Sequence, residues 1–198
     1  MARPLRAQIP GGIYHVASRG NRKQPIYRDD ADRTLWLTTL DSTVAACGWI
    51  CHAYCLMTNH FHLVVETPEP NISRGMQRLN ATHADWINWR YGFNGHLFQG
   101  RFFSQLAKSQ EHLLELARYV VLNPVRAGLC SSAVAWRWSS LRATIGLVPA
   151  PRFLTTAWIL AQFDPQPATA VQMYVEFVEE GEAAVASADM PGSGPGMF

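Results

Sequence analysis

Two short runs rich in β-forming residues, at 49–57 and 60–66, constrain the fold most strongly because only two residues separate them. Thr58 and Asn59 form this connection, and such a short link is typical of a β-hairpin. Side chains alternate between the faces of a strand, so His60 and His62 share one face of the second run while its other face is apolar. The chain is therefore predicted to contain an antiparallel sheet with two neighbouring histidines on one face.

The other periodic segments place this hairpin in a mixed fold. Alternating residues indicate strands, and apolar residues at spacings of three and four indicate helices. Strands are expected at 13–19 and within 96–108. Helices are expected from Asp29 or Asp30 to Gly48, over 71–89, and from Ser109 onward. Pro124 should end the third of these helices. This order predicts an α+β fold, an antiparallel sheet with helices packed on it, followed by a C-terminal helical appendage.

The length of 198 residues allows one domain with additions. We expect a main domain over 1–130, an appendage over 131–183 with helices near 155–163 and 168–180, and a flexible tail over 184–198. No secretory signal and no run of eighteen uncharged apolar residues is found, which predicts a cytosolic protein without a membrane partner. The four cysteines form no CxxC pair and are expected to remain thiols.

Charge is divided unevenly along the chain. All 17 Lys and Arg residues lie at or before Arg152, together with nine of the 15 acidic residues, so this part carries a net charge of +8. The remainder carries −6. A basic body suits a polyphosphate partner, and fifteen of the basic residues are Arg, whose planar fork binds phosphate. A genome biased toward Arg codons would explain the Arg excess equally well, but not the segregation of charge.

Tyr119 and Asn123 form a second pair of interest. On a helix, residues four apart project from one face, so the phenol and the amide are expected to lie together. The Asn carbonyl oxygen suits Mg²⁺ or Mn²⁺ better than Zn²⁺. Taken alone, this pair also fits a surface tyrosine near a helix end, and His60 with His62 also fits histidines that merely pack in a half-buried strand.

Several segments, taken in order, resemble the HUH single-tyrosine transposases and, within them, the REP-associated tyrosine transposases, which act on single-stranded DNA. The resemblance covers roughly residues 10–145. The matching segments are IYHVASRGNRK at 13–23, YCLMTNHFHLVVET at 54–67, GRFFS at 100–104, RYVVLNPVRAGL at 118–129 and WRWSS at 136–140. The acidic segment after Phe153 matches no motif of the family.

The resemblance assigns roles to individual positions. It implies that Tyr119 is the nucleophile and that His60, His62 and Asn123 hold Mg²⁺ or Mn²⁺. The expected DNA-binding residues are Arg19, Asn21, Arg22, Lys23, Arg101, Arg118 and Arg126.

The implied activity is metal-dependent cleavage and joining of single-stranded DNA near REP-type hairpins through a 5′-phosphotyrosine. The REP-associated group is expected to work as a monomer, while a dimer stays open because some relatives share active sites between two subunits. Two alternatives stay open: a hairpin-binding regulator without strand transfer, and a metal phosphohydrolase in which water attacks. An RNA substrate also stays open, because no residue in the sequence identifies a contact to the 2′-hydroxyl.

Overall fold

Four antiparallel strands form one sheet in the computed structural model, which describes residues 8–188. They are β1 (Gly12–Arg19), β2 (Ile50–Leu56), β3 (His60–Thr67) and β4 (Phe103–Leu106). Their order across the sheet is β2-β3-β1-β4. Every neighbouring pair is antiparallel, which confirms the predicted hairpin and fold class.

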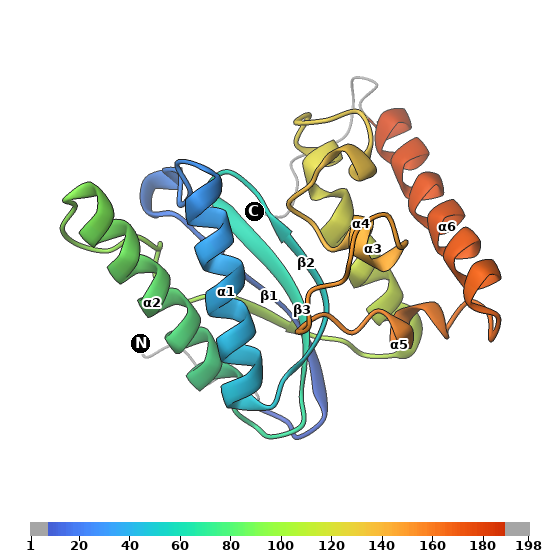
Figure 1. The fold of residues 1–198 in the computed structure, drawn as a ribbon, viewed down its shortest axis with the longest axis horizontal. Coiled ribbons are helices and arrows are strands. Elements are labelled where there is room, and N and C mark those ends of the chain that lie inside the picture. Colours follow the sequence, from blue (N-terminus) through green and yellow to red (C-terminus); the bar gives the residue numbers. More distant parts are fainter. Residues whose placement is uncertain (1–7, 189–198) are drawn as a thin grey trace.

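Helices cover both faces of this sheet (Figure 1). On one face, α1 (Asp30–Cys47) and α2 (Ile72–Tyr91) lie side by side, and on the other lies α3 (Gln110–Arg126), with α6 (Pro167–Ala188) packed against its outer side. The shorter elements are η1 (Asn21–Lys23), η2 (Ala133–Ala135), α4 (Leu141–Thr144) and α5 (Ala157–Leu160). None of the helices described is long and apolar enough to cross a bilayer.

The alternation of β3 separates two apolar clusters. Phe61, Leu63 and Val65 are fully buried in the cluster that also contains Trp36 of α1. Val64 faces the opposite way and packs in the cluster formed with α3. The face that carries His60 and His62 is therefore the α3 face, and the sheet itself separates these histidines from α1 and α2.

Pro124 does not end α3, so that prediction was wrong. The helix continues to Arg126, and the Ala127 N–H still donates to the Asn123 carbonyl over 3.0 Å. Proline has no N–H for the carbonyl four residues earlier, that of Val120. The Asn123 side chain replaces this donor, because its Nδ2 lies 3.4 Å from the Val120 oxygen and 2.8 Å from that of Tyr119.

The last helix is longer than predicted, since it was expected over 168–180. Helix α6 begins at Pro167 and extends to Ala188, five residues into the expected tail, and the tail's remainder, 189–198, lies outside the described residues. Its apolar face explains the extension, because Tyr174 and Val178 are buried in the α3 cluster. Helix α6 thus packs onto α3.

Asp32 joins the start of α1 to the end of α2. Its fully buried carboxylate accepts hydrogen bonds from the Arg28 N–H at 2.8 Å, Arg90 Nη1 at 2.6 Å and the Tyr91 hydroxyl at 2.9 Å. Burial raises the pKa of Asp32, but the hydrogen bonds from Arg28, Tyr91 and Arg90 outweigh burial and leave the pKa below its ordinary value. A charged carboxylate therefore stabilises this corner of the fold.

Replacing this carboxylate tests its contribution. We expect Asp32→Ala to lower the free energy of unfolding by about 2–3 kcal/mol, because hydrogen bonds to a charged group are lost in a buried site. Urea unfolding followed by tryptophan fluorescence measures the change. Asp41→Ala is the control, since Asp41 forms an exposed ion pair with Arg152 and should matter much less. Equal losses in the two variants would contradict the assignment.

Candidate active site

His60 and His62 lie side by side on the α3 face of β3. Their ring centroids are 4.9 Å apart, and His62 is buried while His60 is partly exposed. Strand β1 supplies the neighbouring residues, because Arg19 pairs with His60 and Ala17 pairs with His62. The structure therefore confirms that the two imidazoles share a face, and it adds a basic side chain from the next strand.

Each ring is held through its Nδ1 atom. His60 Nδ1 donates to the Asn59 side-chain oxygen over 2.7 Å, and His62 Nδ1 lies 2.9 Å from Nε2 of His15. The Asn59 amide also donates to the Lys23 carbonyl over 2.8 Å, so Asn59 is itself fixed. A hydrogen bond at one ring nitrogen sets the tautomer and orientation for a ligand at the other. A cation held by these rings would bind through Nε2.

The imidazoles are neutral over the physiological pH range. Burial lowers the pKa of His15 to about 4, and burial together with the charge of Arg19 lowers the pKa of His60 to about 4. The pKa of His62 is also well below its ordinary value, first because of burial and then because of His15, His60 and Arg19. Neutral imidazole is the form that binds a metal ion.

Helix α3 brings Tyr119 to the same place. The half-buried Tyr119 ring lies 5.8 Å from the His62 ring and 5.6 Å from the His15 ring, measured between centroids. The guanidinium carbon of Arg126, about two turns later on α3, lies 5.0 Å from the Tyr119 centroid. Asn123, one turn after Tyr119, is buried, and its Nδ2 is engaged by the helix backbone. Its carbonyl oxygen is the atom suited to a cation.

A pocket of about 260 Å³ opens beside the histidines. Arg19 and Arg101 line it together with His60 and His62, and Phe98 and Phe103 add apolar walls. This combination of neutral imidazoles, cationic guanidinium groups and aromatic rings suits a phosphate with its attached base.

The predicted DNA-binding residues do not all lie at this pocket. Arg19 and Arg101 line it, whereas Asn21 and Arg22 line a second pocket, next to the exposed Lys23. Arg126 lies against Tyr119. Arg118 points toward α6 instead: its guanidinium lies 2.7 Å from Glu115 and 4.1 Å from the Phe177 centroid.

Sequence reasoning missed His15 and Asn59. His15 alternates with Ala17 and Arg19 along β1, so its face was predictable, but its partner was not, because His62 is 47 residues away. Asn59 was interpreted as a turn residue, and its position directly before His60 was the available signal. Both residues hold the histidine pair.

Comparison with known families identifies the class of protein to which the chain belongs. Residues 9–123, more than half of the chain, match the model of the IS200-like transposases. The chain therefore belongs to the IS200-like transposase family.

Among solved structures, a REP-associated tyrosine transposase bound to a REP hairpin is similar in fold. The match has a TM-score of 0.64 and 18% sequence identity, and it covers 75% of this chain and 89% of the other. A search of curated proteins returned no match.

The lowered pKa values predict how the site histidines titrate. In metal-free protein, the ring ¹⁵N shifts of His15 and His60 should remain those of neutral imidazole when the pH falls below about 6.5, the ordinary pKa of histidine. The shifts should change only near pH 4. Folding disfavours these protonated rings, so the stability linked to them is complete above about pH 6.5 and falls as the pH is lowered toward 4. The urea-unfolded chain is the control. Midpoints near 6.5 in the folded protein would contradict the burial argument.

Proposed function

We propose that the chain cuts and rejoins single-stranded DNA in a metal-dependent reaction with Tyr119 as the nucleophile. The observation that carries this proposal is the approach of the Tyr119 ring to within 5.8 Å of the His62 ring, beside a pocket lined by arginines, in an IS200-like transposase. The hairpin bound in the similar solved structure supports a REP-type DNA hairpin as substrate. We expect a monomer that acts in the cytosol.

The donor set fits a divalent cation. His60 and His62 offer neutral imidazoles, and Asn123 offers an amide oxygen, a combination compatible with Mg²⁺ or Mn²⁺. Within residues 8–188, no group of three or more His, Cys, Asp or Glu side chains is arranged to hold a metal ion. The proposed site therefore depends on Asn123 and on oxygen atoms of the substrate. When bound, the cation would neutralise phosphate charge and polarise the phosphorus.

The proposed step exchanges one phosphoester for another. The Tyr119 oxygen forms a bond to phosphorus and loses its proton, while the bond from phosphorus to the 3′-oxygen breaks and that oxygen leaves as a hydroxyl. The product is a 5′-phosphotyrosine. Because the number of phosphoester bonds is unchanged, another 3′-hydroxyl can reverse the step without a nucleotide cofactor.

The chain's own residues position the reactants. Arg19 and Arg101 line the pocket where the phosphate would bind, and their guanidinium groups offer paired donors to its oxygens. His15 and Asn59 hold the imidazoles through Nδ1 and act as positioning residues. Helix α3 sets Tyr119 beside them. Proximity of this kind is a large part of phosphoryl-transfer catalysis.

Covalent trapping tests the nucleophile. With hairpin-containing single-stranded DNA and Mg²⁺ or Mn²⁺, the wild-type protein should form an adduct that survives a denaturing gel, and Tyr119→Phe should form none because the attacking oxygen is gone. Tyr174→Phe is the matched control, since Tyr174 is buried in α6 and should leave the adduct intact. An adduct with Tyr119→Phe would exclude Tyr119.

The same assay separates the alternatives. His60→Ala and His62→Ala should abolish cleavage while retaining most DNA binding, since phosphate contacts from Arg supply much of the affinity. Cleavage by the wild-type protein without an adduct would favour water as the nucleophile. Binding without any cleavage would favour a regulator.

Asn123 has two roles in this proposal, and Pro124 allows them to be separated. Asn123→Ala should lower the cleavage rate at least about tenfold, about 1.4 kcal/mol, because a cation ligand is lost. It also removes the donor that replaces the missing Pro124 N–H. In Asn123→Ala/Pro124→Ala, an N–H is restored to the helix, so stability should recover but cleavage should not.

Thermal unfolding and single-turnover cleavage measure the two effects, with Pro124→Ala alone as the control. Recovery of cleavage in the double variant would assign Asn123 a purely structural role.

A further inference from the structure

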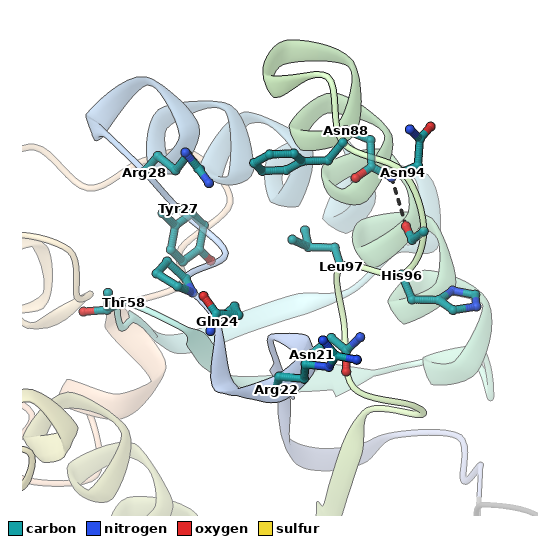
Figure 2. Close-up of a pocket in the computed structure, with 13 residues that line it drawn as sticks. Asn21, Arg22, Gln24, Tyr27, Arg28, Thr58, Asn88, Asn94, His96 and Leu97 are labelled. Carbon is teal, nitrogen blue, oxygen red and sulfur yellow. Dashed lines mark hydrogen bonds between the residues drawn. The ribbon is translucent and has the colours of Figure 1, made fainter.

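A second and larger pocket lies next to the site and has no role in the mechanism above. Its volume is about 760 Å³, within the range of about 300–1,000 Å³ typical of ligand sites. Figure 2 shows its two walls, one formed by residues 21–28 and the other by residues 88–97. Leu97 projects between them, and Thr58 of the β2–β3 turn closes one side.

The charge of this pocket is suited to an anion. Arg22 and Arg28 line it, and none of the described lining residues is acidic. The Arg28 guanidinium carbon lies 4.6 Å from the Phe93 centroid and 4.9 Å from that of Tyr91. Stacking of this kind leaves the guanidinium edge available to a phosphate. The neighbouring Arg90 differs, because Asp29 and Asp32 neutralise it.

The pocket also offers amides and flat apolar surface. Asn21, Gln24 and Asn94 line it and are exposed, and each amide carries both donors and an acceptor. Phe93 is an exposed aromatic residue at the rim, with 41% of its surface accessible. Amides recognise the edges of nucleobases, and aromatic rings stack on their faces. The lining therefore favours a nucleotide over a simple anion.

The two pockets share one partition. Gly20 forms a β-bridge with Phe98, and the Asn21 N–H donates to the Leu97 carbonyl over 2.8 Å. On one side of this partition, Arg19 and Phe98 line the histidine pocket, and on the other, Asn21 and Leu97 line the second pocket. A DNA strand with a phosphate at the histidines would have only this partition to cross to reach the second pocket.

The loop that forms the partition is held in a strained conformation. Arg22 and Lys23 have φ angles of 53° and 60°, a region that non-glycine residues rarely adopt. The Asn59 amide secures the loop at the Lys23 carbonyl, and the same Asn59 binds His60. Strained backbone of this kind concentrates at ligand sites. The loop thus links the second pocket to a histidine of the active site.

We propose that the second pocket receives one unpaired nucleobase of the DNA strand, close to the phosphate that is cleaved. Phe93 stacks on the base, the amides contact its edge, and Arg22 and Arg28 bind the adjoining phosphates. This inference rests on the proposed function, because it takes DNA as the ligand. It assigns the pocket a role in choosing the substrate, separate from the chemistry at Tyr119.

The test combines abasic DNA with pocket variants. Tyr119→Phe protein without divalent metal prevents cleavage, and fluorescence anisotropy measures its affinity for hairpin DNA with a single-stranded flank. In a series of probes, each flank position in turn carries an abasic site. We expect one or two positions where loss of the base weakens binding about tenfold, as for a stacked base. In Phe93→Ala, that penalty should disappear at the same positions and persist elsewhere.

Two further variants keep the test independent of folding. Trp89→Ala removes an aromatic residue that is 75% exposed on α2, four residues before Phe93, and that does not line the pocket, so its abasic penalties should match those of the parent. Arg22→Gly suits the positive φ of this position and should not lower the melting temperature. Because an abasic site keeps its phosphates, loss of the Arg22 guanidinium should weaken binding of all the probes.

The outcomes separate this inference from the proposed function. Binding that shows the same abasic penalties in the parent and in Phe93→Ala would overturn the base pocket and leave strand transfer untouched. Failure of the parent to bind any single-stranded DNA would overturn the proposed function as well. A penalty lost in Phe93→Ala and retained in Trp89→Ala would support the pocket.

Discussion

The pairing of β1 with β3 decides which face of the sheet carries the candidate active site. This register sets Arg19 opposite His60 and Ala17 opposite His62. A slip of one residue in β3 would turn both imidazoles into the layer beneath α1 and α2, and Phe61 with its apolar neighbours would face α3. Burial of each large apolar side chain contributes about 1.5–3 kcal/mol. The core on one side of the sheet therefore holds the polar site on the other side in place.

Helix α3 holds Tyr119 on a regular element although Pro124 lies inside the same helix. An interior proline removes a backbone hydrogen bond and disfavours the helix by about 3 kcal/mol. Asn123 offsets part of this loss because its side chain donates to the carbonyls of Tyr119 and Val120. The contact leaves the amide oxygen of Asn123 as the atom suited to a cation. One side chain can thus support the helix and complete the proposed metal site.

The periodicity of the sequence predicted what depends on local structure. Alternation in β3 put His60 and His62 on one face, and helical spacing put Tyr119 and Asn123 one turn apart. What depends on distant pairing was not predicted. The contact of His15 with His62 follows from strand register. The continuation of α3 past Pro124 was missed because its compensation comes from a side chain, which the helix-ending rule for proline does not consider.

The strained loop after β1 connects the second pocket with the histidine pair. Arg22 and Lys23 are the non-glycine residues with positive φ among residues 8–188, and such conformations cost about 1–2 kcal/mol each. The Asn59 amide and the Gly20–Phe98 bridge stabilise the loop against this cost. Because the loop is already ordered in the folded protein, less conformational entropy is lost when a ligand binds. A loop fixed to Asn59, which also orients His60, therefore holds the second pocket and the histidine pair together as one preformed surface.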